Sequence, residues 1–182
     1  MSPVFGGTHP SGTHNALVSL GSQVYLEIAA PVAGAQSGHP WVDAARRRPE
    51  PHLYSYCMRS ALPLSELARA SAMAGIRAFG PSEGSRNTPE GVALNWQLFI
   101  PIVPAAGNAI PFLIDWEDTP HPAETTSSAV KLAGFSVQHP EPHRIRDAMA
   151  LLAPEVCLTP GQEELSLSAE LLTPHGPIPL SS

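Results

Sequence analysis

The sequence predicts an α+β protein built from repeated β-α-β-β-β modules, which form antiparallel, barrel-like curved sheets with helices on the outer face. Two observations predict this class. The order of one strand, one helix and three strands occurs twice, over about 52–116 and 132–180, and a hairpin ahead of them resembles the end of a third copy. Hydrophobic residues make up 43% of the chain and charged residues 14%, which predicts a folded core despite 21 prolines.

The first part of the chain carries the hairpin. Two β-prone runs, 14–20 and 23–29, flank Gly21 and Ser22, and this pattern is typical of two strands joined by a tight turn. Residues 32–51 are rich in Ala, Gly, Pro and Arg without any period. We therefore expect a long connecting loop there.

The first full module follows. Residues 52–59 predict a strand, and apolar or small residues with helical spacing predict a helix over about 64–75. The polar segment 80–91 is rich in turn-forming residues. The alternation in 92–100 predicts a half-buried strand, and its expected partner is the run 110–115.

A second connector, 116–131, contains prolines that disfavour a regular element. The module pattern then returns, and we expect its members at 132–138 (strand), 145–152 (helix), 155–159, 164–173 and 178–180 (strands). The expected division is a pair of modules over 1–125, the first of them incomplete at its N-terminus, and an additional module over 126–182.

Charge and cysteine content exclude several classes of protein. The net charge is −6, and the basic residues form only one tight cluster, Arg46 to Arg48, which argues against nucleic-acid binding. Cys57 and Cys157 lie far apart within apolar runs, as buried free thiols often do, and this indicates a reducing compartment. No signal peptide is recognisable and the apolar runs are short, so we expect a cytoplasmic protein without a membrane partner.

Four runs of sequence resemble the glyoxalase-like family of the vicinal oxygen chelate superfamily. The runs are Gly6 to Leu17, Tyr25 to Ile28, Pro111 to Pro122 and Leu171 to Ile178. The resemblance implies paired modules around a small-molecule pocket. It also implies a divalent metal such as zinc, nickel, manganese or iron, held by the first and last strands of each module and acting as a Lewis acid.

The sequence departs from the family pattern in two places. An Asp-His strand and a helix are expected ahead of Gly6-Gly7, but Met1 stands almost directly before them. The strand that begins the next module reads Leu53 to Cys57, which offers poor ligands for a hard cation. The first module therefore leaves an edge and an apolar face to be covered, and we expect a homodimer that covers them.

Glu27 and His14 are the candidate catalytic residues and candidate metal ligands. Glu27 lies in an apolar strand, where a carboxylate needs a cation or a hydrogen-bond partner, although it could also face solvent. His14 could line the pocket or cap a strand. The Asp115–His121 segment is rich in ligand-capable groups but could equally be a solvated turn, and Trp96 could be a core residue. The candidate substrate-binding residues are His9, Asn15, Arg86, Trp96, Asp115, Trp116 and His121.

The expected function is small-molecule chemistry. The resemblance implies metal-assisted lyase, isomerase or dioxygenase chemistry on a small oxygenated or carbonyl compound. The alternative is a binding or sequestration protein of the same fold, or a fragment of a longer gene product. No nucleophile elbow, phosphate loop or His-Glu-x-x-His motif is present in the sequence.

Overall fold

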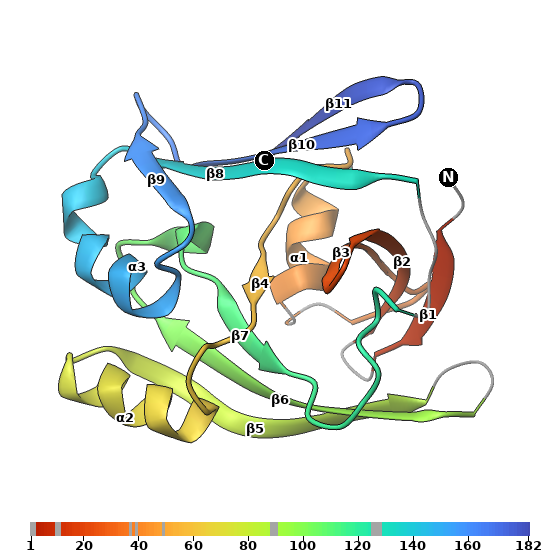
Figure 1. The fold of residues 1–182 in the computed structure, drawn as a ribbon, viewed down its shortest axis with the longest axis horizontal. Coiled ribbons are helices and arrows are strands. Elements are labelled where there is room, and N and C mark those ends of the chain that lie inside the picture. The colour runs from red at the N-terminus through yellow and green to blue at the C-terminus, as the bar shows by residue number, and fades with distance from the viewer. Residues whose placement is uncertain are drawn as a thin grey trace.

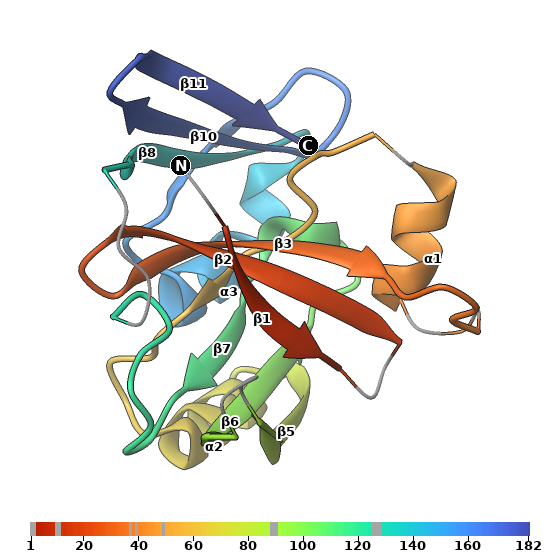
Figure 2. The ribbon, with the colours of Figure 1, turned by 90° about the vertical axis from the view of Figure 1, so that its right-hand side faces the viewer.

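The computed structural model describes residues 3–9, 12–36, 38, 40–48, 50–87, 91–124 and 129–182, apart from the side chains of Arg86 and Asn87. These residues form three sheets. In Figure 2 the N-terminal sheet faces the viewer, with the C-terminal sheet above it and the central sheet below it. The mixed α+β class is therefore confirmed, in the form of open sheets. No helix among the described residues is long and apolar enough to cross a membrane.

The N-terminal sheet has the order β1-β2-β3, with β1 at Val4–Thr8, β2 at Thr13–Gly21 and β3 at Val24–Pro31. The predicted hairpin is confirmed, because β2 and β3 pair antiparallel across the Ser22-Gln23 turn. β1 was not expected. Its two glycines give it little strand propensity of its own, and its pairing with β2 is what holds it in the sheet.

The expected loop at 32–51 is wrong in part, because α1 (Pro40–Arg47) forms within it. Proline at the first helical position and arginines in the last turn both favour this helix. Val42 and Ala44 are buried, so the helix is fixed by packing rather than by a long apolar period. α1 lies against β3.

The central sheet has the order β4-β7-β6-β5 and is covered on one face by α2 (Leu64–Met73). Its strands are β4 (Cys57–Met58), β5 (Arg77–Asn87), β6 (Ala93–Ile102) and β7 (Phe112–Asp115). A 3-10 turn, η1 (Gly107–Ala109), precedes β7. The strand expected at 52–59 is only two residues long, because β4 pairs with just Phe112 and Leu113 of β7.

The turn-rich reading of 80–91 is also wrong in part, because most of this segment belongs to β5. Gly, Pro and Ser are poor strand formers, but β5 pairs with β6 over nearly its whole length. Pro81 is tolerated since β5 is an edge strand and the register shifts between Phe79 and Ser82. Tertiary pairing therefore overrides local propensity.

The C-terminal sheet repeats the order of elements but not their pairing (Figure 1). Its sheet order is β11-β10-β8-β9, so β8, the first strand of the unit, lies inside the sheet and runs parallel to β9. In the central sheet β4, the first strand, lies at the edge and runs parallel to β7, the last strand. The members are β8 (Lys131–His139), η2 (Pro142–Arg144), α3 (Arg146–Leu152), β9 (Cys157–Pro160), β10 (Ser166–Thr173) and β11 (Gly176–Ser181). The boundary at 125/126 stays a prediction.

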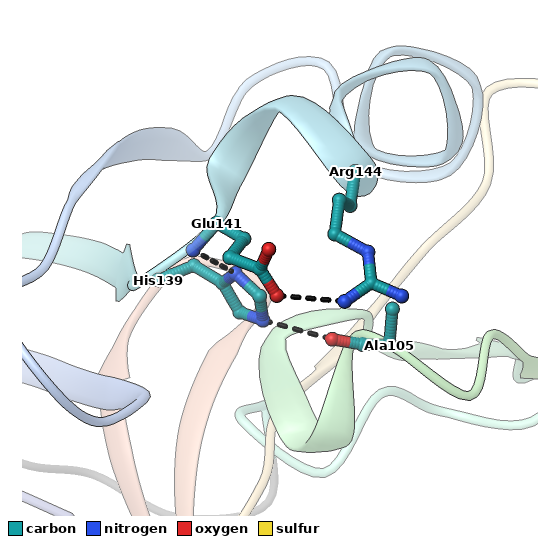
Figure 3. A network of polar contacts seen from close by, with 4 residues as sticks. All are labelled: Ala105, His139, Glu141 and Arg144. Carbon is teal, nitrogen blue, oxygen red and sulfur yellow. Dashed lines mark hydrogen bonds and ion pairs between the residues drawn. The ribbon is translucent and has the colours of Figure 1, made fainter.

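The C-terminal unit shares its core with the central sheet. Ala148 and Leu152 of α3 pack with Phe99 and Leu113 on the face that α2 also covers. At the end of β8, His139 adds a polar connection, shown in Figure 3. Its Nε2 donates to the Ala105 carbonyl at 2.9 Å, and its Nδ1 accepts from the Glu141 amide at 3.1 Å.

Candidate functional site

Side chains alternate across β2 and β3, so the N-terminal sheet has two different faces. One face carries Val18, Leu20 and Leu26, which pack with Leu171 of the C-terminal sheet. Leu17 is paired with Glu27 and Ser19 with Tyr25, which places these residues on the opposite face, called the inner face below. Glu27 therefore lies on the inner face of the sheet.

Asn15 holds Glu27 on this inner face. The Asn15 Nδ2 donates to Glu27 Oε1 at 2.8 Å, and the Asn15 side chain is buried, with 4% of the residue exposed. A Cβ on Gly6 would stand 2.3 Å from Asn15 Oδ1, so β1 needs glycine where it passes Asn15. The Gly6-Gly7 pair of the sequence thus makes room for the residue that orients the carboxylate.

Cys57 of β4 faces the same carboxylate. Burial raises the pKa of the Cys57 thiol to about 12, and the negative charge of Glu27 acts in the same direction. A hydrogen bond with the Tyr25 side chain and one with the backbone act in the opposite direction but are weaker. Cys57 therefore stays protonated at neutral pH, as an inert thiol in contact with the site rather than a nucleophile.

A row of rings extends from Glu27's strand to the central sheet. Tyr25 lies 5.5 Å from His121 between ring centroids, His121 lies 6.4 Å from Trp116, and Trp116 lies 5.3 Å from Trp96. The Trp116 indole nitrogen is buried without a hydrogen-bond partner. Asn15, Tyr25, Glu27, Cys57 and His121 are called the Glu27 cluster below, and Tyr25, His121, Trp116 and Trp96 the ring row.

His121 is held as a hydrogen-bond donor. Its Nδ1 accepts from the Ala123 amide at 3.2 Å, which leaves the proton on Nε2. Burial lowers the pKa of His121, Arg59 acts in the same direction and Glu124 opposes it. The imidazole is therefore uncharged at neutral pH.

This shift predicts a pH dependence of stability. In the unfolded chain the pKa of His121 returns to its ordinary value of 6.5, so below that pH the unfolded chain binds a proton that the folded chain does not. The contribution of His121 to the free energy of unfolding is therefore fully present above pH 6.5 and is lost as the pH falls below it. In urea unfolding at about pH 7.5 and about pH 5.5, His121→Gln should lose less stability on acidification than the unaltered chain. An equal loss in both proteins would show that His121 does not contribute.

Several predicted site residues lie elsewhere. His14 lies on the face of β2 opposite to Asn15, and its ring centroid is 6.4 Å from that of Phe5. His9 Nδ1 is bonded to Thr13 Oγ1 at 2.9 Å. Asp115 Oδ1 accepts from the Glu117 amide at 3.0 Å and so stabilises a turn. Arg86 belongs to β5, but its side chain falls outside the described residues.

The structure thus brings Asn15, Glu27, Trp96, Trp116 and His121 into one region. Tyr25 and Cys57 were not predicted as site residues. Tyr25 stands two positions before Glu27, and this spacing on a strand is the signal that could have found it.

The donor set of the Glu27 cluster does not fit a tightly held divalent metal. His14 is turned away from Glu27, one oxygen of which is already bonded to Asn15, and the Cys57 thiol is not a ready ligand. Across the described ranges, no three His, Cys, Asp or Glu side chains are grouped so that they could hold a metal ion.

We expect purified protein to retain much less than one zinc, nickel, manganese or iron per chain after dialysis, because one carboxylate leaves most of the coordination to water. Elemental analysis measures this retention. A stoichiometric metal that survives dialysis would contradict the prediction, and a Glu27→Gln protein analysed beside it would then show whether Glu27 is a ligand.

Two hollows lie away from the cluster. The larger, an open groove of about 580 Å³, runs along α2 and the beginning of β5. The smaller, of about 240 Å³, lies between residues 48–54 and the C-terminal strands. Neither is lined by Glu27, whereas Glu27, Tyr25 and His121 are each partly exposed and can be reached from solvent.

Fold and site together define an α+β protein of strand-rich modules, with a carboxylate and a row of rings between two of its sheets. The chain belongs to the family described as the glyoxalase-like domain, whose model matches residues 1–153. The predicted resemblance is therefore confirmed, and the match ends at α3, ahead of β9.

A solved structure titled as a hypothetical protein from Staphylococcus aureus has a similar fold. The TM-score is 0.69 at 14% sequence identity, and the match covers 100% of this chain and 76% of the other. At this identity the likeness concerns the fold alone. No curated protein matches the sequence.

Proposed function

We propose that the chain binds a small oxygenated or carbonyl compound at the Glu27 cluster, with Glu27 as the proton acceptor. The observation that carries this proposal is the Asn15–Glu27 hydrogen bond, which fixes one carboxylate oxygen on the inner face. Asn15 donates to Oε1 and not to Oε2, so Oε2 of Glu27 is the oxygen that is available to a ligand. A positioned carboxylate contributes to proton transfer from carbon next to a carbonyl group.

The uncharged His121 supports the same proposal. A proton on its Nε2 can be donated to a ligand oxygen, and the lowered pKa means that the donor carries no charge that would attract Glu27. Tyr25 links the two residues, since it lies on the strand of Glu27 and against the ring of His121. A base and a donor on either side of a small carbonyl compound are the elements of isomerase or lyase chemistry.

Proton exchange tests the proposal. Three- to six-carbon 2-oxo and 2-hydroxy carbonyl compounds, dihydroxyacetone among them, are incubated with the protein in D₂O and followed by NMR. The protein should accelerate exchange of the proton next to the carbonyl group, and Glu27→Gln should reduce the acceleration by about 10²-fold or more. Glu124→Gln, an exposed carboxylate near His121, is the matched control and should retain it.

Exchange that survives Glu27→Gln would remove the catalytic role from this residue. The second candidate function is binding without catalysis, and the ring row favours it, because aromatic faces hold small molecules without any metal. Saturable binding of a compound that undergoes no exchange would support this second candidate.

We also propose that the protein is a cytoplasmic homodimer. Both cysteines are free, as in a reducing compartment. Val4 and Phe5 of edge strand β1 are exposed, and uncovered apolar edges favour association with a second copy. Sedimentation of a monomer at micromolar concentration would contradict the dimer.

A further inference from the structure

The central sheet has one face that α2 covers and a second face, called the open face below. Phe99 of β6 and Leu113 of β7 are paired, and both belong to the core under α2. Because side chains alternate along a strand, Ile100 and Phe112 lie on the open face. The antiparallel register makes Ile100 and Phe112 neighbours, one step beyond the Phe99–Leu113 pair.

Two links place the Glu27 cluster against the open face. Cys57 of β4 is paired with Phe112, so it lies on the open face, and the negative charge of Glu27 acts on its thiol. Trp96 lies four residues before Ile100 on β6, so it also lies on the open face. Trp96 is one end of the ring row, whose other end lies on the strand of Glu27.

One row of side chains crosses the open face outward from the cluster, over β4, β7, β6 and β5 in turn (Figure 1). Beyond Cys57 it continues with Phe112 and Ile100, and it ends at Phe79, the partner of Ile100. Phe112 is half-buried, Ile100 is 42% exposed and Phe79 is 69% exposed. The row therefore begins at the cluster and opens outward to solvent.

The chemistry of the row decides what can lie on it. Beyond Cys57 it consists of two phenyl rings and one aliphatic side chain, which offer a ligand no hydrogen bond. Large apolar side chains that stay this exposed mark a surface that another apolar group covers. Neighbouring strands stand about 4.8 Å apart, so three strand spacings make the row roughly 14 Å long, enough for a chain of about ten carbon atoms.

We propose that the ligand of the Glu27 cluster is a carbonyl compound with an unbranched aliphatic chain of about ten carbon atoms, a length set by the row. The carbonyl head lies at Glu27, and the chain lies along Phe112, Ile100 and Phe79. This substrate class rests on the function proposed above for Glu27, and it adds the part of the ligand that lies outside the cluster.

The probe is 1-hydroxy-2-decanone, and its controls are hydroxyacetone, which has the same head without the chain, and 1-decanol, which has the chain without the carbonyl group. In NMR titrations the probe should give saturable shifts at Ile100 and Phe79. It should bind about 10²-fold more tightly than hydroxyacetone, because each methylene group that leaves water adds affinity. It should bind about 10-fold more tightly than 1-decanol, which lacks the carbonyl head.

Two variants test the row. Phe79→Ala and Ile100→Thr should each weaken binding of the probe about 10-fold, because each removes apolar contact with the chain. Threonine keeps the β-branched shape that suits a strand. The matched control is Met73→Ser, since Met73 is 83% exposed but belongs to α2, on the covered side of the sheet. This control should bind the probe as the unaltered chain does.

Affinity and proton exchange separate this proposal from the catalytic role of Glu27. Glu27→Gln keeps the row, so the probe should keep most of its advantage over hydroxyacetone although exchange is lost. Exchange of hydroxyacetone by the unaltered chain, together with equal affinities for the two ketones, would overturn the chain site and leave the role of Glu27 intact. A dimer that Phe79→Ala dissociates in sedimentation would assign the open face to a second copy and would overturn it too.

Discussion

Phe99→Ala is expected to lower the free energy of unfolding by about 3–5 kcal/mol. Phe99 is 1% exposed and stands where α2 and α3 meet on the central sheet, so the variant leaves a cavity that two helices border. Urea unfolding followed by circular dichroism measures the change. The lost packing should also loosen α3, which holds the C-terminal unit against the central sheet.

The matched control is Phe79→Ala, since Phe79 is also in the central sheet but is 69% exposed. Its effect should stay within about 0.5 kcal/mol, as for other surface substitutions. A loss at Phe99 no larger than the loss at Phe79 would mean that the shared core of α2 and α3 does not form.

Gly6→Ala is expected to have the largest effect on the site. The new Cβ would stand 2.3 Å from Asn15 Oδ1 and 3.0 Å from Asn15 Cγ, so the Asn15 side chain must shift, which disturbs its hydrogen bond to Glu27 Oε1. We expect a loss of stability of about 1–3 kcal/mol, because a buried amide is left without its partner. We also expect loss of the proton-exchange activity proposed for Glu27. Unfolding experiments and the exchange assay measure the two effects.

Gly134→Ala is the control for this substitution. Gly134 is also a strand glycine, but a Cβ there would meet nothing within 4 Å, and its φ is not positive. Alanine should therefore be neutral or slightly stabilising at 134, since it lowers the entropy of the unfolded chain. Equal effects at both positions would show that the contact between Gly6 and Asn15 is not important.

The sequence was most informative where local patterns decide the structure. The β2–β3 hairpin follows from two β-prone runs around a Gly-Ser turn, and α2 and α3 follow from apolar residues with helical spacing. β5 could not be predicted this way, because its glycines and serines form a strand only through pairing with β6. α1 was missed since eight residues rich in arginine show no long apolar period.

For the site, the sequence could indicate Glu27, but not its surroundings. A charged residue between Leu26 and Ile28 is a local signal, whereas the electrostatic interaction of Glu27 with Cys57 joins strands of two sheets that are separated in the sequence by α1. The same limit explains why the sequence could not separate His14 from Asn15 as the residue beside Glu27. Only the pairing of β2 with β3 shows that Asn15, and not its neighbour His14, shares a face with Glu27.

The pairing of the C-terminal sheet also bears on the order in which the chain can fold during synthesis. β2 pairs with strands that are close to it in sequence, so the N-terminal sheet can form early. β8 lies between β9 and β10 and must wait for residues up to 173. Until α3 has been made, the apolar face of the central sheet also lacks part of its cover. A nascent chain that stalls before residue 146 would therefore leave Phe99 and Leu113 covered by α2 alone, and chaperones bind partly uncovered apolar surfaces of this kind.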